Sequence, residues 1–113
     1  MAAPKKEYQC ALVLTHDLIG GKWKLRILWH VLHGDNRYMQ LCRAIPDITQ
    51  KVLTTQLREL EASGLLVRTV HEDALLHVEY ALSPKYEQLV PVIEELCAFS
   101  RFYARENDIS LAD

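Results

Sequence analysis

Five hydrogen-bonding side chains fall within nine residues of the sequence, at a spacing that keeps them off one apolar stripe of a helix. They are Gln50, Lys51, Thr54, Thr55 and Arg58. A helix that enters the major groove of DNA needs such groups near its N-terminal end. Amides and hydroxyls hydrogen-bond base edges, arginine forks onto guanine and lysine contacts phosphate. The same residues would also suit an ordinary solvated helix face, and the pattern alone does not choose between the two.

The helix that must position these side chains is well marked. Thr49 offers an N-cap hydroxyl, Leu53, Leu57 and Leu60 recur on one buried stripe, and Gly64 ends the helix. Beyond it, apolar residues alternate with polar ones in 66–70 and again in 78–82, which predicts two strands. Residues Glu72 to Leu75, including Asp73 and Ala74, are expected to form the turn between them.

Helices are expected on both sides of this unit. Upstream, Tyr8 to His16 predicts a short helix, 22–33 a longer one, and the segment from Tyr38 to Ile45 another that Pro46 must end. Downstream, Ser83 and Pro84 supply an N-cap and first residue for a last helix reaching about Arg105, which Pro91 should bend. This order, mainly α with a β-hairpin, is that of a winged helix-turn-helix.

The charge distribution favours DNA over a merely solvated face. The formal net charge is −2, yet residues 20–70 carry eight Lys/Arg against four Asp/Glu, while residues 71–113 carry three against nine. Only the local field matters for binding a polyanion.

Residues 1–113 are expected to form a single domain with terminal dimerisation helices. No apolar run approaches the roughly 20 residues that cross a bilayer, so we expect a cytoplasmic protein without a membrane partner.

Other chemistry finds little support in the sequence. His30 and His33 lie three residues apart on one predicted helix, with Cys42 nearby in sequence, but further metal ligands at recognised spacing are lacking. We therefore expect no metal and no cofactor. No Ser/His/Asp set, paired carboxylates or phosphate loop stands out, so an enzyme is not expected. The three cysteines, Cys10, Cys42 and Cys97, read as free thiols.

Several runs of the sequence, in order, carry a family resemblance. They are the run from Leu18 to His30 with its Gly-Gly-Lys-Trp, the Gln-Lys-Val-Leu run that starts at Gln50, and the run from Val78 to Pro84. Together they closely resemble the HxlR-type bacterial winged-helix transcriptional regulators over roughly residues 8–100. The resemblance implies a homodimer through the first and last helices, a recognition helix from Gln50 to Glu61 and a wing from Val67 to Leu82.

The sequence departs from the family pattern in two places. Ala74, Leu75 and Leu76 stand where the wing tip usually carries prolines, and Met39 and Gln40 stand where a serine and an acidic residue are usual. Glu72 and Asp73 at the tip would be repelled by phosphate. We therefore assign contacts with the DNA backbone to Arg68 and His77. Lys22 and Arg37, near helix starts, are either further phosphate contacts or solvated surface charges.

Two further assignments concern the terminal helices. The expected dimer interface consists of Leu12, Leu89, Ile93, Leu96, Phe99 and Phe102. Cys10 lies near the start of the first helix, where the dipole favours a thiolate, and several redox-sensing members of the family have a cysteine there. It is either a redox switch or a small packed residue, whereas Cys42 and Cys97 look like packing.

The resulting hypothesis is a regulator of transcription that binds a pseudo-palindromic operator in double-stranded DNA as a homodimer. An oxidant or a small molecule could act as its effector. The alternatives are a winged-helix protein-interaction module without DNA binding, and a stress-sensing switch in which thiol or metal chemistry controls the dimer.

Overall fold

The computed structural model describes residues 3–73 and 75–112. Its elements follow in the order α1 (Ala11–Ile19), α2 (Lys24–Leu32), α3 (Tyr38–Ala44), α4 (Gln50–Ala62), β1 (Leu66–His71), β2 (His77–Leu82), the 3₁₀ turn η1 (Pro84–Tyr86) and α5 (Leu89–Glu106). Within the described residues, no helix combines the length and hydropathy that a membrane crossing requires. The predicted order of elements is confirmed, and the two strands form an antiparallel hairpin.

The core lies where α2, α3 and α4 meet the base of the hairpin. Its fully buried side chains are Ile27 and Leu28 from α2, Leu41 from α3, Ile45, and Leu53, Leu57 and Leu60 from α4. The three leucines are the stripe that the sequence predicted. Burying each leucine side chain contributes roughly 1.5–3 kcal/mol, so this stripe fixes which side of α4 faces outward.

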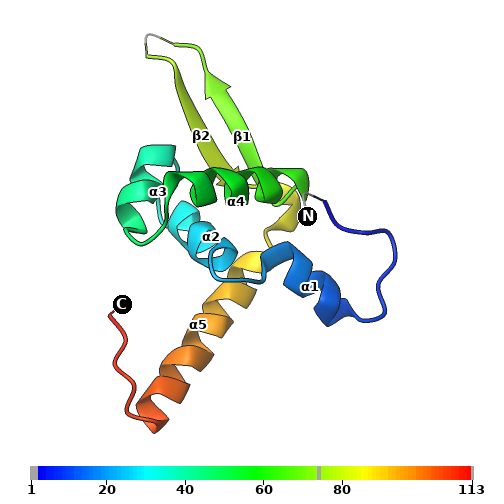
Figure 1. Ribbon diagram of the computed structural model, residues 1–113, viewed down its shortest axis with the longest axis vertical. Coiled ribbons are helices and arrows are strands. Elements are labelled where there is room, and N and C mark those ends of the chain that lie inside the picture. Colours follow the sequence, from blue (N-terminus) through cyan, green and yellow to red (C-terminus); the bar gives the residue numbers. More distant parts are fainter. Residues whose placement is uncertain (1–2, 74, 113) are drawn as a thin grey trace.

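The hairpin is anchored at its base and free at its tip. The backbone N–H of Tyr80 donates to the carbonyl of Asn36 at 2.8 Å, and that of Ser83 donates to the carbonyl of Leu65 at 2.8 Å. From there β1 and β2 project away from the helices, while α5 runs in the opposite direction (Figure 1). The predicted turn residue Ala74 lies outside the described residues.

Two predicted helix starts were wrong. The first helix begins at Ala11 and not at Tyr8, because Cys10 is its N-cap while the Tyr8 hydroxyl donates to the Asp17 carboxylate at 2.6 Å. This carboxylate raises the pKa of Tyr8. The preceding residues therefore fold back along α1 instead of extending it.

The second correction concerns the last helix. The Ser83 hydroxyl accepts from the N–H of Lys85 and caps η1, and α5 starts only at Leu89. Pro91 is thus the third residue of α5. The N–H groups of a first turn have no partner within the helix, so proline is tolerated there and the bend that we expected has no cause.

Candidate nucleic-acid interface

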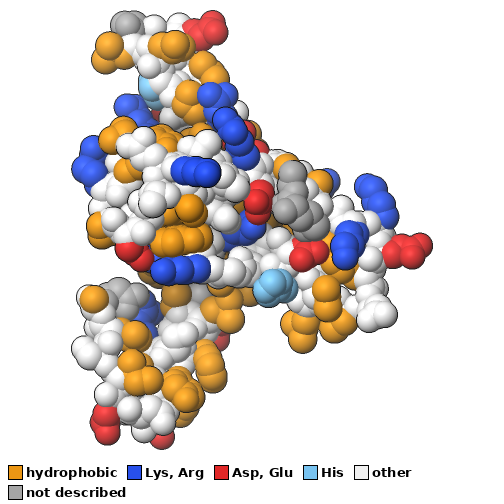
Figure 2. Space-filling view, in the orientation of Figure 1, with side chains coloured by type: hydrophobic (Ala, Val, Ile, Leu, Met, Phe, Trp, Pro, Cys, Tyr) orange, Lys and Arg blue, Asp and Glu red, His pale blue; other side chains and the backbone are white. Residues whose placement is uncertain are grey.

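The outward side of α4 carries the predicted contact residues. Gln50, Lys51, Thr55 and Arg58 are exposed and Thr54 is half-buried. Thr49 caps the helix, since its hydroxyl accepts from the N–H of Val52 at 3.1 Å. Lys and Arg side chains lie over the helical body and the base of the hairpin with some acidic side chains among them, and further acidic side chains mark the hairpin tip and the far end of α5 (Figure 2).

The start of α4 is held by a residue that the sequence reasoning did not single out. The hydroxyl of Tyr38, at the start of α3, donates to the carbonyl of Gln50 at 3.0 Å and lies 3.0 Å from Thr54 Oγ1. These two bonds join α3 to the N-terminal part of α4, where contacts with bases are predicted. The hydroxyl of Thr54 is therefore engaged within the protein, and the hydroxyl of Thr55 donates to the carbonyl of Lys51 at 3.0 Å.

Two ion pairs join α2 to α4 and to the segment that precedes α4. Lys24 Nζ lies 2.6 Å from Glu59 Oε1, and their side chains are only 12% and 22% exposed. Arg26 donates to both carboxylate oxygens of Asp47, which lies between α3 and α4. This guanidinium lowers the pKa of Asp47, and the carboxylate in turn raises the pKa of Arg26. Lys22 is exposed, and its ammonium lies 4.7 Å from the centre of the Trp23 ring, over which Arg26 also lies at 5.3 Å.

A groove separates α4 from the hairpin and brings two predicted contact residues together. It has a volume of about 440 Å³ and is lined by Tyr38, Thr54, Leu57, Arg58, Glu61, Arg68 and Tyr80. Arg58 and Arg68 are ten residues apart in the sequence but border the same groove. The fold therefore brings these two basic residues to one groove.

His77 is more constrained than the sequence suggested. Its Nδ1 lies 3.0 Å from the carbonyl of Leu75, and its Nε2 lies 2.9 Å from Glu79 Oε1. These hydrogen bonds, first to Leu75 and then to Glu79, raise the pKa of His77 against the opposing charge of Arg37. The same bond lowers the pKa of Glu79. Arg37 itself is exposed, and its charge acts on both groups of this cluster.

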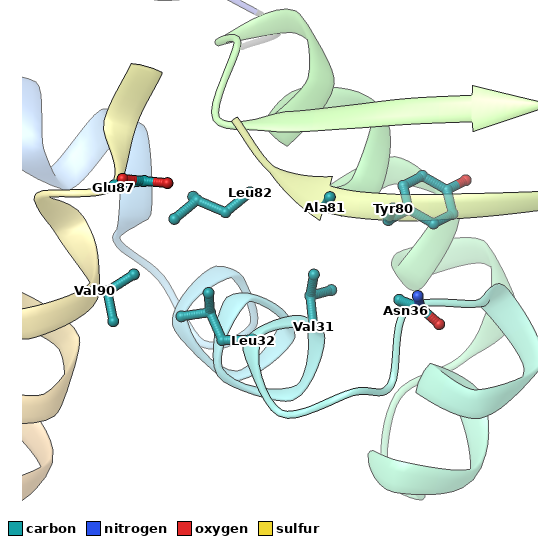
Figure 3. A pocket seen from close by; sticks show the side chains of 8 residues that line it. All are labelled: Val31, Leu32, Asn36, Tyr80, Ala81, Leu82, Glu87 and Val90. Carbon is teal, nitrogen blue, oxygen red and sulfur yellow. The ribbon is translucent and has the colours of Figure 1, made fainter. Parts of the chain in front are cut away.

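A hollow on another side of the molecule does not carry comparable chemistry. It measures about 530 Å³ and lies between α2, β2 and the segment that enters α5. Figure 3 shows Val31, Leu32, Leu82 and Val90 around it. Glu87 is the only carboxylate among the residues that line it. The hollow is thus mainly a gap between apolar packing surfaces.

The three cysteines occupy different environments. Cys10 is exposed, and its Sγ accepts from the N–H of Leu12 at 3.4 Å at the N-terminus of α1. Cys10 therefore does not pack against the core of its own chain. Cys42 is half-buried against the core, and Cys97 lines a cavity of about 770 Å³ between α2, α5 and the C-terminal segment.

The predicted dimer residues divide into two groups. Leu12, at 75% exposure, and Phe99, at 64%, extend into solvent with Leu96 and Phe102. Ile93 is only 3% exposed, and Leu89 is half-buried against the same core. Ile93 packs against the core of its own chain, so its assignment to the interface was wrong. Leu89 is only partly buried and lies beside α1, and it stays a predicted interface residue.

Comparison with known proteins identifies the architecture. Residues 18–108 match the family described as HxlR-like helix-turn-helix. The uncharacterized HTH-type transcriptional regulator YkvN of Bacillus subtilis is 42% identical over 101 residues, which cover 89% of this chain and 86% of YkvN. The solved structure of the HTH-type transcriptional regulator ytcD is 41% identical, covers 86% of this chain and 99% of its own, and superposes with a TM-score of 0.77.

A second similar structure belongs to a protein described as a redox regulator. The redox regulator HypR in its oxidized form is 38% identical, covers 81% of this chain and 95% of its own, and gives a TM-score of 0.75. The family match spans α2 to α5 and includes both α4 and the hairpin. The chain therefore belongs to the HxlR-like helix-turn-helix family of transcriptional regulators, and its fold is a winged helix-turn-helix.

Proposed function

We propose that this chain regulates transcription by binding a pseudo-palindromic operator in double-stranded DNA as a homodimer. The observation that carries the proposal is the outward side of α4, whose exposed polar residues are backed by a fully buried leucine stripe. Two such helices, one from each subunit, would enter successive major grooves about 34 Å apart.

The side chains take different roles in this arrangement. Gln50, Thr55 and Arg58 would read base edges, Thr55 while its hydroxyl also donates to the Lys51 carbonyl, and Lys51 would contact phosphate. Thr54 acts by holding α4 against Tyr38, because its hydroxyl is engaged there. A base contact would have to share that hydroxyl.

The remaining predicted residues would contact the DNA backbone. They are Lys22, Arg37, Arg68 and His77. Arg68 lines the groove between α4 and the hairpin, as Arg58 does. A phosphate at His77 would have to replace either the Leu75 carbonyl or the Glu79 carboxylate as acceptor.

The direct test starts from an operator selected out of a random duplex library. Arg58→Ala should weaken binding to that operator by about 1–3 kcal/mol and barely affect random DNA, because only a base contact distinguishes the two. Lys51→Ala should weaken binding to the operator and to random DNA alike, and should reduce the slope of log K against log salt concentration by about one. Arg105→Ala, near the far end of α5, is the matched control and should bind as the wild type does.

A folded triple variant Gln50/Thr54/Arg58→Ala that binds with wild-type affinity would refute the assignment of α4. Failure to recover any sequence, together with binding that does not depend on salt, would favour the protein-interaction module instead.

The homodimer is proposed to form through α1 and α5. Leu12, Leu96, Phe99 and Phe102 leave an apolar surface on these helices that a single chain does not cover. Leu96→Asp with Phe102→Asp should give monomers in sedimentation equilibrium. Val70→Asp, an equally exposed apolar position on the wing, should leave the association state unchanged. A wild-type protein that is monomeric at micromolar concentration would refute this interface.

Cys10 is proposed to couple oxidation to DNA affinity. Its exposed sulfur lies at the N-terminus of α1, where a negative charge is favoured, and the similar protein HypR is described as a redox regulator. Peroxide would convert the thiolate to a sulfenic acid, and a second thiol would then displace water to form a disulfide. If this disulfide shifts α1 at the dimer interface, it would alter the spacing of the two recognition helices.

Iodoacetamide should modify Cys10 faster than Cys42 or Cys97, which are both half-buried. Mild peroxide should change operator binding in the wild type but not in Cys10→Ser. If Cys10→Ser responds to oxidant as the wild type does, Cys10 is not the sensor.

A further inference from the structure

One side of the wing brings together three side chains that commonly bind metals. The strand register pairs His71 with His77 and Thr69 with Glu79, so Glu79 follows His77 by two residues on the same side of the hairpin. The two imidazole rings stack with centroids 4.7 Å apart. Glu79 Oε1 lies 2.9 Å from His77 Nε2 and 3.5 Å from His71 Nε2.

These separations are those expected between ligands of one small cation. Zinc bound tetrahedrally at about 2.0–2.1 Å places neighbouring nitrogen and oxygen ligands about 3.3 Å apart. One ligand atom from each of the three residues falls within 4.8 Å of the others. A metal ion could therefore be bound with only small side-chain movements.

The surrounding hydrogen bonds also orient the ligands. His77 Nδ1 lies 3.0 Å from the carbonyl of Leu75, which places the proton on Nδ1 and leaves Nε2 to bind a metal. Asn36 Nδ2 donates to Glu79 Oε2 at 3.2 Å and leaves Oε1 directed at the histidines. Histidine and carboxylate ligands of metals are commonly fixed by outer hydrogen bonds of this kind.

We propose that His71, His77 and Glu79 form a binding site for a divalent zinc-class cation that clips the two strands of the wing together. Three protein ligands leave one tetrahedral position for water. Binding replaces the contact between His77 and Glu79 by two bonds to the metal, and any proton on His77 Nε2 passes to solvent. The Asp73 carboxylate, 3.8 Å from His77 Nδ1, adds negative charge, while the Arg37 guanidinium opposes the cation.

The test uses untagged protein with the Cys10→Ser substitution, so that the exposed thiol cannot compete for zinc. Isothermal titration with Zn²⁺ should show one site per chain. His71→Asn and Glu79→Gln should each lower the affinity at least tenfold, because each removes one of three ligands. His33→Asn, a change at the exposed histidine directly after α2, is the control and should retain the affinity.

Two spectroscopic measurements locate the ion independently of DNA binding. Co²⁺ should give a tetrahedral absorption spectrum without a thiolate charge-transfer band. Zn²⁺ should slow hydrogen exchange of the β1 and β2 amides in the parent protein but not in His71→Asn. His71 lies near the free end of the hairpin and outside the core, so this variant should fold. Equal zinc affinity in the parent and both ligand variants, or a cobalt spectrum with thiolate ligation, would overturn the proposal.

Discussion

The Tyr38 hydroxyl should stabilise the helix-turn-helix through its two hydrogen bonds to α4. Tyr38→Phe removes both, the one to the Gln50 carbonyl and the one to Thr54 Oγ1, and keeps the ring. A protein hydrogen bond contributes about 0.5–1.5 kcal/mol net, so the free energy of unfolding should fall by about 1–2 kcal/mol. Thr54→Val removes only the shared bond and should cost about 1 kcal/mol. The double variant should cost about 0.5–1 kcal/mol less than the sum of the single variants, because both delete the same bond.

Urea unfolding at one fixed protein concentration measures these quantities, and unchanged m-values show that the comparison is sound. Tyr103→Phe is the matched control, because the Tyr103 side chain is exposed on α5 and its hydroxyl has no hydrogen-bond partner among the described residues. A Tyr38→Phe variant as stable as the control, or a coupling free energy of zero, would refute the idea that this hydroxyl joins α3 to α4.

Three other perturbations follow from the packing and the electrostatics. Leu53→Ala, at a fully buried position of α4, should lower the free energy of unfolding by about 2–5 kcal/mol in urea, and a loss below about 1 kcal/mol would contradict its central place in the core. Lys24→Met should cost about 1–2 kcal/mol by leaving Glu59 half-buried without its partner, and adding Glu59→Gln should recover part of that loss. The pKa of His77 is raised above 6.5, so its contribution to stability is full below pH 6.5 and is lost as pH rises through the folded value. The pKa of Glu79 is lowered below 4.5, so its contribution is full above pH 4.5 and is lost as pH falls through the folded value. The pair should therefore stabilise the hairpin most between pH 4.5 and 6.5, and an NMR titration that places the His77 pKa at or below 6.5 would contradict this.

Periodic features of the sequence predicted most of the fold. Thr49 and the leucines at 53, 57 and 60 predicted α4, because capping and a 3.6-residue apolar repeat are local properties. The two-residue alternation predicted the hairpin for the same reason. The outward side of α4 follows directly, since residues that are off the stripe must face solvent or a ligand. This is why the candidate DNA-contact residues could be named before the structure.

The residues at which helices start were less predictable than the helices themselves. Ser83 and Pro84 are typical of a helix start, and they do cap a helical turn, but that turn is η1 and not α5. Tyr8 fitted an apolar helical pattern, yet its hydroxyl bonds Asp17 and leaves Cys10 to cap α1. Such choices depend on partners that the local pattern does not include.

The sequence alone determined the order of elements, the buried stripe of α4 and the basic middle segment, because all three depend on neighbouring residues. Only the tertiary structure decided which distant side chains meet. It placed Tyr38 against Thr54, Lys24 against Glu59, and His71 beside His77 and Glu79. It also turned Ile93 into the core and left Phe99 in solvent. Contacts of this kind are set by how helices and strands pack in space, and residue types and local spacing do not specify that geometry.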